Sequence, residues 1–175
     1  MMSAFRMLLA ALLCVVMAGC GGPTSSGDDV STKSRADVEA ELRQKPSFEQ
    51  AQPVYRDAVR QMADGVAALV PGMTWQFYED SWSGCDPPYV HTSGVVVYVA
   101  VSFDKPFPDD VWPAALDMVT AGAAKLGITD RGKLIDSAGH HDISITGHGG
   151  IVQFATYKAS TLTAQSDCRM RETPQ

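Results

Sequence analysis

The chain has 175 residues, with 14 Lys and Arg against 20 Asp and Glu, and a formal net charge of −6 at pH 7. An acidic chain without any cluster of basic residues is repelled by nucleic acids and by anionic membrane surfaces, so nucleic-acid binding is excluded. The length accommodates one domain with a hydrophobic core of its own.

Residues 1–19 have the pattern of a lipoprotein signal peptide. A start that carries Arg6 precedes the apolar run 7–18, and small residues then lead into Cys20. This run is too short to span a membrane, which takes about 20 apolar residues, and its layout is that of a secretory signal. We therefore expect cleavage before Cys20 and diacylation of its thiol. The mature chain, of net charge −7, would be anchored at the extracytoplasmic face of a bacterial cell membrane.

The segment that follows the lipidated cysteine is polar. Residues 20–33 are small and show no apolar periodicity, which predicts a flexible tether. A single domain is expected over 34–175. It begins with a short helix from about Arg35 to Gln44, for which Ser34 supplies the N-cap.

The strongest helical pattern lies between about Ser47 and Leu69, where apolar residues recur at steps of three or four. Ser47 and Gln50 resemble a capping box. Pro53 lies inside this pattern, so either the helix kinks there or it begins near Gln52.

Strand patterns come next. Thr74 to Tyr78 alternates and is rich in strand-forming residues, and a loop rich in Gly, Pro and Asp is then expected to carry Trp82 and Cys85. Gly94 to Phe103 is nearly continuous in Val and aromatic residues. This run predicts a central strand that is covered, at least partly, on both faces.

A second long helix is expected from about Asp109 to Leu126. Asp109 or Asp110 would cap it, Pro113 fits only its first turn, and Gly127 is suited to end it. The two neighbouring carboxylates are therefore interpreted as a helix start rather than as a calcium site, for which the EF-hand spacing is absent.

The last third of the chain predicts short strands at 133–136, 142–146 and 151–157. After them the chain either turns at Lys158-Ala159-Ser160 or continues as one long strand to Ser166. Helices and strands in this order, with short connections, predict an α+β fold. It would contain an antiparallel sheet of about four to six strands with helices packed on one face.

Two cysteines remain once the signal peptide and the lipidated residue are set aside. Cys85 and Cys168 would lie in an oxidising compartment, where two cysteines are expected to form a disulfide. A metal or redox site made of two thiols is the alternative, but short Cys-x-x-Cys spacing is absent. We predict one structural disulfide, which ties the loop after the first strand to the end of the last one.

Several segments of the chain resemble the LppA-type lipoproteins of mycobacteria. In chain order they are Ala67-Ala68-Leu69-Val70-Pro71-Gly72, Met73-Thr74-Trp75-Gln76-Phe77, Gly84-Cys85-Asp86, Ala123-Ala124-Lys125-Leu126-Gly127-Ile128-Thr129, and Thr161-Leu162 with Asp167-Cys168. The resemblance covers about Ser47 to Cys168, and its specific parts are Pro-Gly-x-Thr-Trp-x-Phe and the two cysteines. It implies a cell-envelope lipoprotein, and it supplies no established reaction and no catalytic residues.

His140, His141 and His148 are the candidate metal ligands, close to one predicted strand. Zinc needs three or four donors that converge at about 2.0–2.3 Å. Neighbouring residues of a strand point to opposite faces, so His141 and Asp142 cannot both reach one ion without a bulge. We therefore interpret the histidines as exposed loop residues and expect neither a metal nor another cofactor.

Trp75, Phe77, Trp82 and Tyr89 are the best candidates for a ligand groove. Trp75 and Phe77 share one face of a predicted strand, while Trp82 is expected in the following loop and Tyr89 at the rim. The alternative is that the strand residues are plain core. Because no nucleophile elbow and no triad spacing is present, no catalytic residue is assigned.

Together these patterns predict a non-enzymatic lipoprotein of the cell envelope that acts as a binding or interaction module. Its expected partners are the membrane, through the lipid anchor, and either an envelope protein or an apolar ligand. One alternative is a lipid carrier, in which Val95–Val101 and the helix faces would line a cavity. The other is a metal-binding protein that uses the three histidines.

Overall fold

Three helices and six strands make up the part of the chain that the computed structural model describes, residues 33–172. The predicted signal peptide, the lipidation site Cys20 and the tether up to Thr32 lie outside these residues. Within the described part, no helix is both long and apolar enough to cross a membrane. The elements are α1 (Arg35–Leu42), α2 (Phe48–Ala67), β1 (Trp75–Gly84), β2 (Val95–Phe103), α3 (Trp112–Ala124), β3 (Asp130–Ser137), β4 (His140–Gly147), β5 (Gly150–Thr156) and β6 (Ser160–Gln165).

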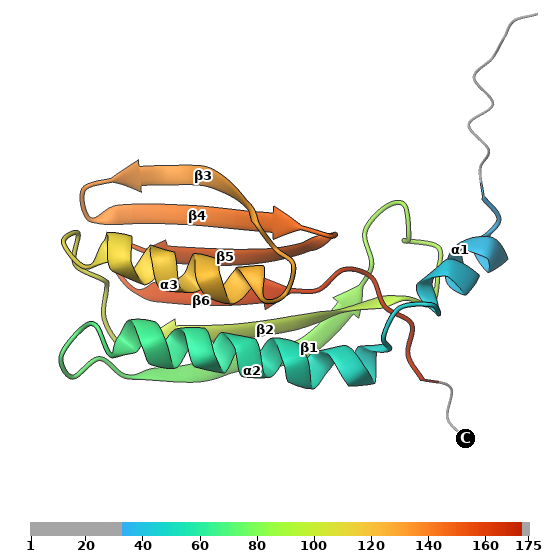
Figure 1. Cartoon of the computed structure of the whole chain (residues 1–175), viewed down its shortest axis with the longest axis horizontal. Coiled ribbons are helices and arrows are strands. Elements are labelled where there is room, and N and C mark those ends of the chain that lie inside the picture. Colours follow the sequence, from blue (N-terminus) through green and yellow to red (C-terminus); the bar gives the residue numbers. More distant parts are fainter. Residues whose placement is uncertain (1–32, 173–175) are drawn as a thin grey trace, which may run out of the picture. The chain divides into compact units, whose positions relative to one another are not determined.

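The six strands form one antiparallel sheet in the order β1-β2-β6-β5-β4-β3. The helices α2 and α3 lie over the same face of this sheet (Figure 1). Strand β2 is interior and nearly all of its residues are buried, as its Val-rich pattern predicted, whereas β1 and β3 are the edges. The predicted α+β fold, with helices on one face and one disulfide, is confirmed.

Helix α2 begins at Phe48, so the alternative start near Gln52 is wrong. The Ser47 hydroxyl oxygen accepts a hydrogen bond from the Gln50 N–H at 3.1 Å, and the Gln50 side-chain oxygen accepts one from the Ser47 N–H at 3.3 Å. This reciprocal cap satisfies two N–H groups at the helix start. The helix then continues through Pro53, whose ring lacks the N–H that a helix bond requires.

Helix α3 begins later than predicted and without a side-chain cap. Its N-cap is Val111 and Pro113 stands in its first turn, so the prediction that Asp109 or Asp110 caps this helix is wrong. Gly127 follows with φ 76°, the left-handed conformation that ends many helices. The Asp109 side chain contacts the β3–β4 hairpin instead.

Two tight turns separate the last three strands. His148 and Gly149 join β4 to β5, and both have positive φ, 47° and 82°, as a type I′ hairpin turn requires. Thr156 pairs with Ser160 across the next turn. The alternative of one long strand through Lys158 is therefore wrong.

The main core fills the space between the sheet and the two long helices. The inward valines from Val97 to Val101 are 0% exposed and pack with residues of α2 and α3. Phe103, Phe107 and Phe154 add edge-to-face ring contacts, with centroids 5.1–6.4 Å apart. The β2 residues that a lipid carrier would need as cavity lining are therefore packed core.

A second, smaller cluster surrounds the disulfide at the α1 end of the domain. Cys85 and Cys168 are bonded, with Cα atoms 5.6 Å apart, so the residue after β1 is joined to the segment after β6 as predicted. Leu42 of α1 is 1% exposed and packs in this cluster together with Val96 and Met170. The crosslink and α1 thus stabilise the same end of the sheet.

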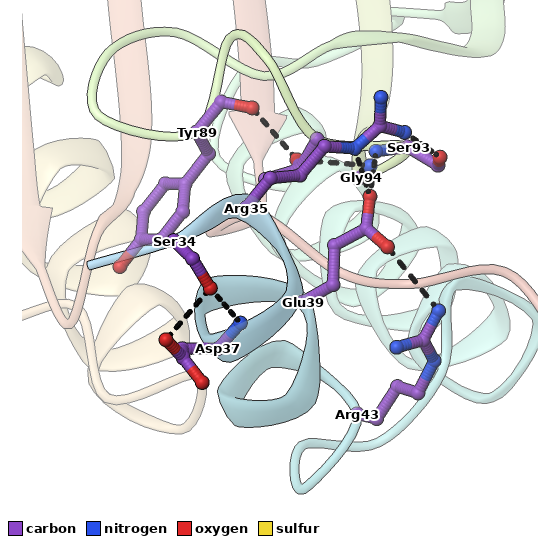
Figure 2. A network of polar contacts seen from close by, with 9 residues as sticks. Ser34, Arg35, Asp37, Glu39, Arg43, Tyr89, Ser93 and Gly94 are labelled. Atoms are coloured by element: carbon purple, nitrogen blue, oxygen red, sulfur yellow. Dashed lines mark hydrogen bonds and ion pairs between the residues drawn. The ribbon is translucent and has the colours of Figure 1, made fainter.

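Helix α1 is held against the loop before β2 by Glu39 (Figure 2). The Glu39 carboxylate accepts hydrogen bonds from the backbone N–H of Ser93 and from Arg35 Nε, both at 2.9 Å, and Arg43 reaches its other oxygen at 3.4 Å. The Ser93 N–H and Arg35 lower the pKa of Glu39 to about 2, because both stabilise the charged carboxylate. The N-terminal end of the described domain is therefore fixed to its sheet by polar contacts as well as by Leu42.

Candidate binding cleft at His141

A cleft of about 560 Å³ opens between α3 and the β3–β4 hairpin. Helix α3 contributes Trp112, Leu116 and Asp117, and strand β3 contributes Arg131 and Asp136. A volume of this size is typical of a small-molecule site, in which an apolar surface is combined with a few polar groups. This cleft is the candidate functional site of the domain.

His141 lines the buried side of the cleft. Strand β4 alternates between buried and half-buried residues, and this alternation turns His141 inward on the same side as Ile143. The residue is 8% exposed, with its Nδ1 2.7 Å from Asp136 Oδ1 and its Nε2 3.2 Å from Asp109 Oδ1. The prediction that His141 is an exposed loop residue is wrong.

Trp112 holds the His141 imidazole from the helix side. The two rings stack with centroids 4.7 Å apart and an interplanar angle of 10°, and the same indole stacks on Phe154 at 4.6 Å. Such ring contacts add about 0.5–1.5 kcal/mol beyond the area that they bury. The stack therefore joins α3 to β4 and β5 on the buried side of the cleft.

Two carboxylates compete for the protons of one imidazole. A carboxylate only accepts hydrogen bonds, and a neutral imidazole has one N–H to donate, so His141 donates to one aspartate when neutral and to both when protonated. Asp109 has a second donor, the Gly139 N–H at 2.8 Å. That bond and the His141 ring lower the pKa of Asp109. Asp109 therefore keeps its negative charge in mildly acidic solution.

One exposed acid and one exposed base line the cleft from opposite sides. Asp117 on α3 and Arg131 on β3 are both exposed, and neither forms an ion pair with another residue between 33 and 172. These two side chains can therefore bind a ligand without first breaking an ion pair with another described residue. A positively charged ligand group with a carbonyl or carboxylate near it would satisfy both.

The cleft opens at the end of the domain far from α1. In Figure 1 the β2–α3 connection, which carries Asp109, and the β3–β4 turn, which carries Gly139, lie at the left end, while α1 lies at the right end. A partner that reaches the domain from this side meets the cleft before it meets α1.

The three candidate metal-ligating histidines do not converge. His140 lies on the opposite face of the sheet from His141, with its ring centroid 4.5 Å from that of Tyr157. His148 lies at the other end of β4, in the turn to β5. Between residues 33 and 172, no group of three or more His, Cys, Asp or Glu side chains is arranged to hold a metal ion.

The four aromatic candidates are divided between two places, so the prediction of a single groove is wrong. Trp75 and Phe77 lie on the helix side of β1, in edge-to-face contact at 5.2 Å. A bulge between Phe77 and Glu79 shifts the alternation of the strand. The shift brings Trp82, which is a strand residue and not a loop residue, to the same side. Tyr89 packs in the disulfide cluster instead.

Polar side chains contact each of the three aromatic rings of β1, of which Trp82 is 54% exposed. The Trp75 indole N–H donates to Asp64 of α2 at 3.0 Å. Guanidinium groups lie over the other two rings, 5.1 Å from the centroid of Phe77 and 4.2 Å from that of Trp82. These contacts fasten the edge strand to its surroundings.

Sequence reasoning did not identify the cleft. One signal was present, because Asp136 and His141 lie directly opposite each other across the β3–β4 hairpin. A turn placed at Ala138-Gly139 would have predicted that pairing. No local pattern indicates that Asp109, which lies in a different connection, joins them.

Comparison with known proteins identifies the relatives of this chain. A family model described as "LppA: Lipoprotein confined to pathogenic Mycobacterium" matches residues 24–172. Two relatives are the lipoproteins LppB and LppA of Mycobacterium tuberculosis, each 27% identical over 135 residues. The match covers 73% of this chain, 61% of LppB and 62% of LppA. This chain therefore spans about three fifths of the length of these relatives.

Two solved structures share the fold. The crystal structure of the lipoprotein LppA from Mycobacterium tuberculosis has a TM-score of 0.67 at 24% identity and covers 79% of this chain and 92% of that one. A DUF4853 family protein from Actinomyces odontolyticus has a TM-score of 0.52 at 15% identity, with 75% of this chain and 73% of that one covered. Because the family model matches most of its length, the chain belongs to the LppA family of lipoproteins.

Proposed function

We propose that this protein is a non-catalytic binding module of the cell envelope, held at the extracytoplasmic face of the membrane by a lipid on Cys20. We propose further that its cleft binds a basic segment of an envelope partner protein. This proposal rests on one observation: the carboxylates of Asp109, Asp117 and Asp136 lie around the same cleft, which has the aromatic ring of Trp112 in its wall. The signal-peptide pattern that ends in Met17-Ala18-Gly19-Cys20 and the membership of a lipoprotein family support the anchoring.

The packing of the interior favours surface binding over lipid transport. A carried acyl chain needs empty apolar volume, whereas the inward face of β2 is filled by side chains at 0–6% exposure. The environment of His141 likewise favours binding over catalysis. Its two ring nitrogens face carboxylates, whereas a catalytic base needs one nitrogen directed at a nucleophile.

Each part of a peptide that carries a lysine or arginine has a complementary group in the cleft. The cationic end of such a side chain is attracted by Asp117 and Asp109. Its methylene stem can lie along apolar surface, here Trp112 and Leu116. The peptide carbonyl groups offer acceptors to Arg131, which projects from the opposite wall.

The binding proposal is tested by NMR titration of the ¹⁵N-labelled mature chain with Cys20→Ser, which removes the lipid. The probes are three capped pentapeptides that differ only in a central lysine, glutamine or glutamate. We expect the lysine peptide to shift the amides of Gly139 and of the first turns of α3. Asp117→Asn should weaken this binding about 2- to 5-fold, the value of one exposed ion pair.

The matched control is Asp57→Asn, which removes an exposed aspartate from α2, outside the cleft. It should leave the affinity for the lysine peptide unchanged. Equal shifts with the glutamate peptide, or shifts that map to another surface, would overturn the assignment of the cleft.

The anchor is tested separately in a related bacterium. The wild-type chain should partition into the detergent phase, and the Cys20→Ser chain should be released from the cells. Release of the wild-type chain, or retention of the variant in the membrane fraction, would contradict lipid anchoring.

A further inference from the structure

The second face of the sheet is not covered by α2 or α3 (Figure 1). The outward residues of the four inner strands are half-buried or exposed, except at Val96 and Ala100. Asp142 is the single acid among these outward positions, and none of them is Lys or Arg. Protein surfaces usually carry about 25–35% charged residues, so the inner strands of this open face are depleted of charge. The edge strands add Glu79, opposite Ala100, and Asp130, opposite Thr146, to the same face.

Hydroxyl and amide groups occupy the middle of the open face. Such side chains donate and accept hydrogen bonds alike, without a preference for either sign of charge. Their alternation on neighbouring antiparallel strands places them side by side on a flat surface. They are Ser102 on β2, Thr161, Thr163 and Gln165 on β6, Gln153 on β5 and Ser144 on β4.

One end of the open face is hollowed. A groove of about 400 Å³ lies there, with Val96, Gln165 and Tyr89 among its lining residues. Lys45, Asp86 and Asp167 add charged groups to the lining, and the Lys45 ammonium pairs with Asp167 at 2.8 Å. Tyr89 packs against the disulfide cluster, so the loop that carries it is held in place by Cys85.

An exposed aromatic pair marks the other end. Tyr157 is 56% exposed, and its ring lies 4.5 Å from that of His140. Gln165, at the groove, is paired with Ile151, and Tyr157 stands six positions after Ile151 in the sequence. At about 3.4 Å per residue, the groove and the aromatic pair are about 20 Å apart.

We infer that this open face binds an extended, uncharged, polyhydroxylated chain, a neutral glycan, between the groove at Tyr89 and the ring of Tyr157. The outward positions of the four inner strands lack Lys and Arg, so they offer no charge to a phosphate or a carboxylate. At the two ends of the face, Lys45 is paired with Asp167 at 2.8 Å, and the Lys158 ammonium lies over the Tyr157 ring at 5.8 Å. With Asp142 on the inner strands, and with Glu79 and Asp130 at the two edges, the face offers little to a polycation. Sugar hydroxyl groups match the Ser, Thr and Gln side chains, and the C–H face of a sugar ring stacks on an aromatic ring. This inference is independent of the proposed peptide binding, which uses the helix side of the sheet.

The test uses the mature chain with Cys20→Ser and three neutral hexasaccharides: cellohexaose, maltohexaose and chitohexaose. We expect at least one of them to bind at millimolar concentration and to shift the amides of β5 and β6. Thr163→Arg, at the centre of the face, and Tyr157→Ala, at its end, should each weaken this binding at least tenfold. Gln61→Arg is the matched control, since it adds the same charge to an exposed position of α2 and should leave the affinity unchanged.

Near-ultraviolet circular dichroism and the melting temperature show whether each variant is folded. Thr163→Arg and Tyr157→Ala are separate tests of the face, so either one suffices if the other does not fold. The inference is overturned if none of the three hexasaccharides binds, or if their shifts map to the cleft at His141. It is also overturned if the wild-type chain is a dimer and Thr163→Arg is a monomer. In that case the open face is an interface between two copies of the chain.

Discussion

Removal of the disulfide is expected to cost a large share of the stability of the domain. Cys85 and Cys168 are 83 residues apart in the sequence, so the bond closes a long loop in the unfolded chain. The chain-entropy model assigns about 4–5 kcal/mol to a loop of this length, and whole domains are stable by about 5–15 kcal/mol. The double variant Cys85→Ala/Cys168→Ala should therefore be folded only marginally.

Urea unfolding, followed by tryptophan fluorescence, measures this loss. Trp112 is buried in the core, so its emission changes when the domain opens. With a slope of about 2 kcal/mol per molar urea, the midpoint should fall by about 2 M. Wild-type protein with the disulfide reduced is the matched control, because both sulfur atoms stay in place and only the crosslink is lost. Its stability should lie within about 1 kcal/mol of that of the double variant.

The reasoning is refuted if the reduced wild-type protein unfolds at the same urea concentration as the oxidised protein. That result would show that the contacts of Leu42, Val96 and Met170 hold this end of the sheet without a crosslink. The slope should also be the same in all three samples. A changed slope would show that the variant had altered the native or the unfolded state itself.

Three further outcomes are expected. Trp112→Ala removes the ring stack beside the cleft and should lower the free energy of unfolding by about 3–5 kcal/mol in the same urea assay. Glu39 has its folded-state pKa lowered from 4.5 to about 2, so the stability it contributes is present above pH 4.5 and is lost as the pH falls towards 2. Protection of the Ser93 amide from hydrogen exchange should decline over that range in the wild type and stay level in Glu39→Gln. Gly147→Ala places a Cβ 2.6 Å from the carbonyl oxygen of Gly127, a backbone atom that cannot easily move, and should cost about 1–3 kcal/mol, seen as a lower melting temperature.

Local sequence patterns were sufficient to predict the long helices and the central strand of the fold. The apolar period of α2 and the capping box at Ser47 are properties of a few neighbouring residues, and so is the continuous apolar run of β2. The start of α3 shows where local reasoning fails. Asp109 is a good capping residue by type, but its carboxylate binds the Gly139 N–H and His141 instead, and these partners come later in the chain.

The bulge in β1 has a similar consequence for the predicted groove. Simple alternation puts Trp82 on the other side of the strand from Trp75, whereas the extra residue after Phe77 puts all three on the helix side. A bulge depends on how one strand pairs with its neighbour. It therefore cannot be predicted from the residues of β1 alone.

The amino-acid sequence by itself determined the α+β class, the long helices and inner strands, and the pairing of Cys85 with Cys168. Each depends on local periodicity or on there being two cysteines left to pair. Tertiary structure alone decided that Asp109, Asp136 and His141 meet beside Trp112. It also decided that the outward residues of the four inner strands, with Asp142 as their one Asp, Glu, Lys or Arg, share one open face. Both features join residues from separate strands and connections, and such residues become neighbours only when the strand order and register of the sheet are set.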